Sequence, residues 1–438
     1  MKRALASSLL LGFLFWVTSM LAADEWPQWR GPNRDGVWNE TGIIEKFNDE
    51  QIRVSWRAEI SSGYSAPSVA QGRVYVTDRL AEPEQSERVH CFDAASGKKL
   101  WMFHYPAPYT ISYTAGPRAA PTVEDGRVFV LGAMAHFHCF DAATGDVLWK
   151  HDLNTEYKIS KSRRMPIWGI TSAPLVDGNL VILQIGGTDG ACLVAFDKKT
   201  GKEQWRALDD KASYSAPIVI QQAGQPVLLC WTGDHLAGLN PQTGDVHWKH
   251  AFAANRMVIN VPTPVVSANR IFLTSFYDGS EMLRLDADQL AVNRVWRRRG
   301  KSEKETDALH SMISTPVMLG DHVYGVDSYG ELRCLDAATG DRVWEDLTAT
   351  PKARWSNIHM VRNGDRIFMF NERGELLIGK LSPGGFQKIS RAKLLAPTTD
   401  QLRRRDGVCW AHPAYAYKHV FARSDKELVC ANLAAERE

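Results

Sequence analysis

The residues of this chain best suited to chemistry are aromatic, imidazole and guanidinium side chains that come just before a recurrent motif of small residues and proline. Flat rings offer faces for stacking, and an arginine binds a carboxylate through paired hydrogen bonds. The set predicts a face that binds an anionic ligand, such as an acidic sugar polymer or an acidic protein segment. The alternative is that the rings only cap a hydrophobic channel. The residues are Tyr64, Arg118, Trp168, Tyr214, His310, Trp355, His359, Trp410 and His412.

The loops that lead to these residues are rich in basic side chains, namely Arg163, Arg164, Arg297, Arg298, Arg299, Arg403, Arg404 and Arg405. Loops held by a rigid scaffold are common functional sites. The charges indicate either an anion-binding mouth or an ordinary solvated surface, because Glu303, Glu305 and Asp307 lie among them. Arg118 is better placed to bind an anion than the arginines at the loop tips, since it directly precedes the small residues of its repeat.

Other chemistry is not indicated by the sequence. There is no H-E-x-x-H, G-x-S-x-G or Walker-type loop, and no metal site is predicted. The 7 cysteines are far apart and odd in number, which does not indicate a disulfide framework. Four of them occupy the same place in separate repeats and are predicted to be small buried side chains: Cys91, Cys139, Cys334 and Cys430.

The strands that must position these groups are indicated by a sequence motif that recurs along the chain. CFDAASGKKLW, CFDAATGDVLW and CLDAATGDRVW are nearly identical, and AFDKKTGKEQW and GLNPQTGDVHW follow the same spacing. An Asp or Asn favours an Asx-turn, and a glycine supplies a positive φ, so the phrase predicts a hairpin turn between two strands. The turn residues are Asp93, Asp141, Asp197, Asn240 and Asp336, with Gly97, Gly145, Gly201, Gly244 and Gly340.

A tryptophan follows each turn and is predicted to pack from the outermost strand of one unit against the neighbouring unit. These residues are Trp56, Trp101, Trp149, Trp205, Trp248, Trp296 and Trp344. Upstream of each phrase, stretches such as SAPSV, AAPTV and STPVM open a short strand with small residues and proline, and a β-branched strand follows. Each unit thus contains four strands.

Four-stranded units repeated radially predict an all-β, eight-bladed β-propeller of antiparallel blades. The last unit lacks a tryptophan strand, whereas Ile52–Ile60 at the N-terminal end has no unit of its own. We therefore expect the N-terminal strand to close the ring by pairing with the C-terminal blade, so that residues 51–438 form one domain.

The N-terminal residues differ from the repeats. Residues 1–23 combine a basic start, an apolar run and small residues, which predicts a secretory signal peptide cleaved after Ala22 or Ala23. Residues 24–50 are expected to be an irregular segment docked on the propeller. We expect an exported protein, periplasmic or extracellular, with no transmembrane segment after signal removal. The net charge of +2 argues against a nucleic-acid partner.

The D-x-x-T-G-x-x-x-W phrase, together with SAP…GRVYV, resembles the quinoprotein-type repeat named after pyrroloquinoline quinone (PQQ). The resemblance covers residues 50 to 435 and implies an eight-bladed propeller. That family includes PQQ-dependent alcohol dehydrogenases and the non-catalytic outer-membrane assembly factor BamB. The segment Trp26–Val37 also looks like the opening of exported PQQ-like repeat proteins.

The resemblance leaves two functions open. A BamB-like binding or scaffold module with a protein or anionic-ligand partner is favoured, and no cofactor is then required. The alternative is a PQQ-dependent alcohol dehydrogenase, in which the resemblance implies PQQ in the channel and Ca²⁺ on Glu, Asn and Asp oxygens. This sequence lacks the adjacent cysteine pair of many such enzymes and matches none of their metal or base positions, so no catalytic residue is assigned.

Overall fold

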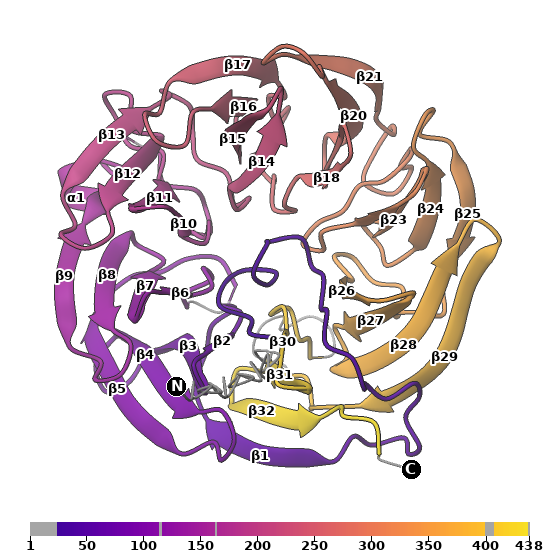
Figure 1. Ribbon diagram of the computed structural model, residues 1–438, viewed down its shortest axis with the longest axis horizontal. Helices are drawn as coiled ribbons and strands as arrows, with labels where there is room; N and C mark the ends of the chain where they lie inside the picture. The colour runs from indigo at the N-terminus through magenta and orange to yellow at the C-terminus, as the bar shows by residue number, and fades with distance from the viewer. Residues whose placement is uncertain (1–23, 114–115, 163, 399–406, 437–438) are drawn as a thin grey trace, which may run out of the picture.

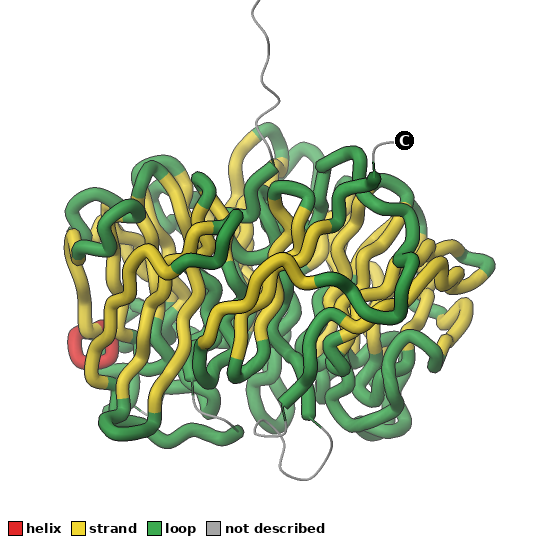
Figure 2. Tube along the Cα trace, turned by 90° about the horizontal axis from the view of Figure 1, so that it is seen from below, coloured by secondary structure: helices red, strands yellow, loops and turns green. Residues whose placement is uncertain are grey.

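The computed structural model describes residues 24–113, 116–162, 164–398 and 407–436. Its strands form eight four-stranded antiparallel sheets that stand around a central axis (Figure 1). Seen from the side, the ring is a thick disc, with its short helix α1 (Leu153–Glu156) at the periphery (Figure 2). The all-β, eight-bladed propeller predicted from the repeats is confirmed.

Four blades come from the first half of the chain. They are β2 (Ser68–Ala70), β3 (Arg73–Leu80), β4 (Ser86–Asp93) and β5 (Lys99–Pro106); β6 (Thr122–Glu124), β7 (Arg127–Leu131), β8 (His136–Asp141) and β9 (Val147–Asp152); β10 (Leu175–Asp177), β11 (Leu180–Gln184), β12 (Leu193–Asp197) and β13 (Glu203–Ala207); and β14 (Ile218–Gln222), β15 (Gln225–Trp231), β16 (His235–Leu239) and β17 (Val246–Ala251).

Three further blades follow in sequence, and the last is shared between the two ends of the chain. They are β18 (Val265–Ser267), β19 (Arg270–Ser275), β20 (Gly279–Leu285) and β21 (Val292–Arg298); β22 (Val317–Leu319), β23 (His322–Val326), β24 (Leu332–Asp336) and β25 (Arg342–Asp346); β26 (Ile358–Asn363), β27 (Arg366–Asn371), β28 (Glu375–Ser382) and β29 (Gly385–Lys393); and β30 (Ala414–Ala416), β31 (His419–Arg423) and β32 (Glu427–Asn432) with β1 (Val54–Glu59).

The N-terminal strand β1 closes the ring. It pairs antiparallel with β32, and Trp56 lies opposite Cys430. The resulting sheet has the order β1-β32-β31-β30, with β30 innermost and β1 outermost (Figure 1). Closure completes the last blade, because the outermost of its four strands comes from the other end of the chain. The expected pairing of the first strand with the last blade is therefore confirmed.

Six of the seven repeated tryptophans lie opposite a small residue of their own blade, and Trp296 lies opposite Met282. Cys91 faces Trp101, Cys139 faces Trp149 and Cys334 faces Trp344 across the outer strand pair. The same place is taken by Ala195, Gly238 and Cys430 in other blades. A large indole beside a ladder favours a small partner across the strand pair. This explains why cysteine recurs, and all 7 cysteines are free and buried.

The same tryptophan also joins its blade to the next. Trp101 Nε1 donates to the carbonyl of Ala142, directly after the turn Asp141, at 3.1 Å. A β-carbon added to Gly145, in that same turn, would lie 2.6 Å from the Trp101 ring. Equivalent Nε1 hydrogen bonds reach Ala94 from Trp56, Lys198 from Trp149, Pro241 from Trp205 and Ala337 from Trp296. Glycine is therefore required at position 145 for two reasons: its φ of 79° is positive, and the Trp101 ring approaches it closely.

The segment before β1 crosses the face of the ring. Trp26 bridges to Val69 of the first blade, and Val37 bridges to Arg362 of β26. Between these anchors the chain passes over the central opening (Figure 1). Ile43 then pairs with Ala434 before β1 begins. The residues predicted to form a signal peptide, 1–23, lie outside the described part of the chain.

Candidate functional site

A cavity of about 130 Å³ lies at the centre of the ring, where the inner strands begin. All eight blades contribute to its wall. Residues i and i+2 of an extended segment face the same side. Each blade can therefore present two such side chains to the axis. Eight of the nine residues predicted from the sequence line this cavity, and His310 does not. The eight are Tyr64, Arg118, Trp168, Tyr214, Trp355, His359, Trp410 and His412.

The middle position of the small-residue motif forms a layer at the floor of the cavity, where Ala120, Ala173, Ala216, His359 and His412 line the cavity itself. Four blades place alanine there, two place threonine and two place histidine; they are Ala66, Ala120, Ala173, Ala216, Thr263, Thr315, His359 and His412. Trp29 of the N-terminal segment packs on the four alanines and donates from Nε1 to Thr263 Oγ1 at 2.8 Å. Small side chains on one side of the axis thus make room for an indole that closes the channel.

Arg34 fastens this plug to the ring. Its guanidinium donates to the carbonyl oxygens of Ala173, Pro174 and Pro217 on two blades, although Arg34 is only 4% exposed. Burial lowers the pKa of Arg34 to about 9. The guanidinium can reach carbonyls on both blades because it carries five donors in a planar fork.

The wall above the floor is formed two residues earlier in seven of the eight blades; in the blade of His359 this position is Asn357, which is not among the described lining residues. Tyr64, Arg118, Thr171, Tyr214, Val261, Ile313 and Trp410 occupy this position, and all of them line the cavity. Tyr64 and Trp410 stack with their ring centroids 6.0 Å apart, and Trp168 packs on Tyr214 at 5.2 Å. The wall is therefore largely aromatic on opposite sides.

The mouth of the cavity is crossed by Tyr113, which is 36% exposed. Its ring contacts Trp168, Trp355 and Trp410, with centroids 6.1, 5.2 and 6.2 Å away. Tyr113 has a φ of 64°, in the left-handed region that non-glycine residues adopt at some cost. The side chain is held there by rings from three other blades.

Three indole N–H groups of the cavity lack an acceptor within the described part of the chain. They belong to Trp168, Trp355 and Trp410, and each nitrogen is buried. Trp355 and Trp410 are 9% and 8% exposed. An indole N–H is only a donor, and a buried donor without a partner is destabilising by about 1–3 kcal/mol. Three such groups around one cavity make it a candidate ligand site.

Arg118 brings a positive charge to the wall. Its guanidinium lies 4.7 Å from the centre of the Tyr64 ring and donates to Gly116 O at 2.9 Å. Burial lowers the pKa of Arg118, while nearby tyrosines and Glu87 act in the opposite direction. Arginine stays charged at neutral pH. No carboxylate of the described residues forms an ion pair with it, so its charge is available to a ligand.

The two histidines of the floor have defined tautomers. His412 Nδ1 lies 2.6 Å from Pro413 O and His359 Nε2 lies 2.8 Å from Trp410 O, and a carbonyl can only accept. The remaining nitrogen of each neutral ring is therefore an acceptor. His412 Nε2 is buried and has no partner among the described residues. Burial, followed by the neighbouring His359, holds the pKa of His412 well below its usual value.

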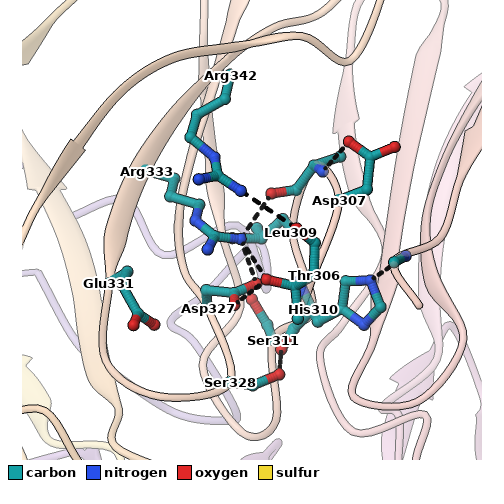
Figure 3. A network of polar contacts seen from close by, with 12 residues as sticks. Thr306, Asp307, Leu309, His310, Ser311, Asp327, Ser328, Glu331, Arg333 and Arg342 are labelled. Atoms are coloured by element: carbon teal, nitrogen blue, oxygen red, sulfur yellow. Dashed lines mark hydrogen bonds and ion pairs between the residues drawn. The ribbon is translucent and has the colours of Figure 1, made fainter. Parts of the chain in front are cut away.

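His310, which the sequence placed at the ligand face, lies instead in a polar network between blades (Figure 3). Its Nδ1 donates to Phe276 O at 3.0 Å, and its Nε2 accepts from Gly300 N at 3.1 Å. Its backbone N–H donates to Asp327, which forms an ion pair with Arg333 at 2.8 Å. Both ring nitrogens of His310 therefore form hydrogen bonds with the backbone, and the side chain does not line the cavity.

Several loop arginines form ion pairs or cation–π contacts with residues of the protein itself. Arg164 pairs with Asp209 at 2.8 Å, Arg298 pairs with Asp307 at 3.1 Å, and Arg297 lies 4.4 Å above the Phe252 ring. None of these residues lines the cavity. Arg163 and the run Arg403–Arg405 lie outside the described residues. The positive charge at the cavity is therefore that of Arg118 among the described lining residues.

The match to known families agrees with this architecture. The family model described as outer membrane protein assembly factor BamB matches residues 85–345 and 293–438, which is more than half of the chain. The chain belongs to the BamB family. Curated BamB proteins of Burkholderia pseudomallei (strain K96243) and Yersinia pestis are each 23% identical, over 173 and 218 residues. These matches cover 39% and 48% of this chain, and 43% and 51% of the relatives, so the chain spans about half the length of the curated relatives it matches.

Solved structures show the same fold. BamB from Moraxella catarrhalis has a TM-score of 0.57 at 17% identity, covering 87% of this chain and 99% of that one. Quinohemoprotein alcohol dehydrogenase from Comamonas testosteroni has a TM-score of 0.62 at 13% identity, covering 94% and 81%. At such identities the likeness concerns the propeller alone. None of the helices in the described residues has the length and apolar character needed to cross a membrane.

The cavity of this BamB-family chain does not match the requirements of PQQ with Ca²⁺. Calcium prefers several carboxylate and carbonyl oxygens, and no Asp or Glu is among the described lining residues. No group of three His, Cys, Asp or Glu that could hold a metal is found in the described part of the chain. PQQ carries three carboxylates, whereas Arg118 is the one Arg or Lys side chain among the described lining residues. A cavity of roughly 150 Å³ holds one benzene ring, so about 130 Å³ suits one ring rather than a fused system.

Several lining residues escaped the sequence prediction. Thr171, Val261 and Ile313 occupy the same repeat position as Tyr64 and could have been found by aligning the motifs. Trp29 and Tyr113 could not have been found in this way, since both lie in irregular segments whose course depends on the assembled ring.

Proposed function

We propose that this chain is an exported, non-catalytic binding protein of the BamB family that holds a ligand at the aromatic end of its channel. The buried indole donors of Trp168, Trp355 and Trp410 around one cavity carry this proposal. These donors lie in the segments that lead into the inner strands of a closed ring, where they are buried and preorganised, which lowers the entropy lost on binding. Among the described lining residues there is no carboxylate or cysteine that could act as a general base or nucleophile.

The N-terminal plug supports binding rather than passage through the ring. Trp29 closes one end of the channel, and Tyr113 lies across the mouth at the other. The cavity between them is a dead end, as a binding site requires. Export, to the periplasm or the medium, follows from the signal-like residues 1–23. Mass spectrometry of the exported protein is expected to show an N-terminus at Ala23 or Asp24.

The test separates binding from redox enzymology. The purified protein is incubated with PQQ and Ca²⁺, and its thermal midpoint and dye-linked alcohol oxidation are measured. We expect no dye reduction and no shift of the midpoint that depends on both additions. A one-to-one PQQ complex that reduces dye in the presence of alcohol would overturn the non-catalytic proposal.

A further inference from the structure

We infer that the cavity binds a single acidic sugar ring, a uronic acid residue, with its carboxylate on Arg118 and its hydroxyl groups on the indole donors and His412. This deepens the binding function proposed above and rests on it. Three features of the cavity define the ligand: its charge, its aromatic faces and its mixture of donors and acceptors.

The charge of the cavity selects an anion. Arg118 is the cation of the described lining, and its hydrogen bonds to Gly116 O and Ser112 O leave other N–H groups of the guanidinium for a ligand. The cation lies against the Tyr64 ring, which fixes its plane. A planar guanidinium in a low-dielectric site binds a carboxylate through two parallel hydrogen bonds. A cationic ligand is disfavoured because it would face Arg118 without a compensating carboxylate.

The walls suit a ring with C–H faces. Tyr64 with Trp410, and Trp168 with Tyr214, present aromatic surfaces on different sides of the cavity. The face of an aromatic ring is electronegative and attracts polarised C–H bonds as well as other rings. A pyranose presents such C–H groups on one face and hydroxyl groups around its edge.

The polar groups require a ligand that both donates and accepts. The indole nitrogens of Trp355 and Trp410 donate, whereas His412 Nε2 accepts because its Nδ1 is committed to Pro413 O. A hydroxyl group can serve either partner, since it has one hydrogen and two lone pairs. A simple aromatic carboxylate can satisfy the donors but has no hydrogen for His412. A neutral hexose can satisfy the hydroxyl contacts but leaves Arg118 without an anion.

The ligand panel tests each feature by isothermal titration calorimetry on the purified protein. It contains galacturonic acid, glucuronic acid, a trigalacturonate, galactose, glucose and benzoate. We expect one-to-one binding of at least one uronic acid. Galactose and glucose are expected to bind roughly tenfold or more weakly, because each lacks the carboxylate that pairs with Arg118. If the free acid and the trimer bind equally, the site recognises the sugar itself; tighter binding of the trimer identifies a chain end as the natural source.

Variants then assign the contacts. Arg118→Gln is expected to weaken uronate binding roughly tenfold or more and to leave the weak binding of galactose unchanged. Trp410→Phe keeps an aromatic face and removes one donor, so affinity is expected to fall roughly fivefold. The matched control is Trp344→Phe, since Trp344 Nε1 donates to Ser382 O at the periphery of the ring, away from the cavity. The control is expected to bind as the wild type does.

The outcomes distinguish this inference from the proposed function. Equal affinity for galactose and galacturonic acid, or for wild type and Arg118→Gln, overturns the acidic-sugar assignment. Benzoate binding as tightly as uronate overturns the role of His412 as a hydroxyl acceptor. The absence of binding by any uronic acid refutes the inference while the non-catalytic proposal still stands. Only PQQ-dependent dye reduction refutes that proposal.

Discussion

At the scale of single residues, the repeat couples two blades through one contact between a tryptophan and a glycine. Trp101 fills the space beside the next turn, and Gly145 has no β-carbon that would occupy it. The backbone conformation and the packing thus both require glycine at this position. Matched glycines in the chain allow the two requirements to be separated.

Gly145→Ala is expected to destabilise the protein more than Gly126→Ala. Both glycines have positive φ, 79° and 70°, but a β-carbon on Gly126 meets nothing within 4 Å. Gly126→Ala is expected to cost about 1–2 kcal/mol from the left-handed backbone alone. Gly145→Ala is expected to cost about 1–3 kcal/mol more, because it displaces Trp101. Urea unfolding of the two variants measures the difference, and equal losses would show that the ring contact contributes nothing.

Buried histidines make the stability of the fold depend on pH. Burial lowers the pKa of His359 to about 4 and that of His138 to about 3. The unfolded chain binds these protons near pH 6.5, whereas the folded chain does not, so stability is complete above that pH and is lost as the pH falls. For His359 alone the loss approaches about 3 kcal/mol at pH 4.

Asp327 acts in the opposite direction over part of this range. Burial raises its pKa to about 6, although Arg333 opposes this, so its contribution is lost as the pH rises from 4 to 6. His138, His359 and His412 together outweigh one carboxyl group, and we expect the urea midpoint to fall between pH 7 and pH 4.5. His359→Gln should reduce this slope, whereas His104→Gln, on the exposed face of β5, should preserve it. A slope unaffected by His359→Gln would contradict the assignment.

At the scale of elements, the segment 24–50 determines the shape of the site although it contributes no blade. It carries Trp29 to the floor of the cavity and is held by Arg34 against the carbonyls of two blades. A binding site at the axis of a propeller needs such a floor, because the inner strands alone enclose a channel.

Arg34→Met is therefore expected to loosen the plug and weaken the fold. The buried guanidinium donates to Ala173, Pro174 and Pro217, and loss of these bonds leaves carbonyl oxygens without donors. The expected loss of unfolding free energy is about 2–4 kcal/mol. Limited proteolysis should cut the segment faster in this variant, while Arg53→Met at the exposed start of the propeller should change neither property. Unchanged proteolysis would show that Trp29 alone anchors the segment.

At the scale of the whole molecule, closure gives the blade at the seam the same contact with its neighbour as a blade in the middle of the chain. Trp56 on β1 donates to Ala94 O at 2.9 Å, as Trp205 donates to Pro241 O at 3.2 Å in the middle of the chain. A terminal strand of an open array would fray independently, whereas a strand in a closed ring unfolds with it.

Trp56→Ala and Trp205→Ala are expected to destabilise the protein equally, by about 3–5 kcal/mol each. Both variants should unfold in a single transition by thermal melting. Hydrogen exchange should show the amides of β30–β32 protected as well as those of β14–β17 in the wild type. A much smaller loss for Trp56→Ala, with early exchange of β32, would indicate that the ring opens at its seam.

The repeated phrases determined the fold because each residue type in them has a local reason. Asp141 and Gly145 form the turn, and the identical spacing of several such turns implies identical units around an axis. Repeat position also placed Tyr64, Arg118 and Trp410 at the cavity, since the residue two before the middle of the small-residue motif lines the cavity in seven of the eight blades.

Irregular segments were decided only by the tertiary structure. His310 turned away from the axis to bond Phe276 and Gly300, and Trp29 and Tyr113 closed the two ends of the cavity. The local pattern of a repeat is set by short-range turn and strand preferences, which the sequence states directly. The course of a loop across a ring is set by the packing of blades far apart in sequence, which exists only once the ring has closed.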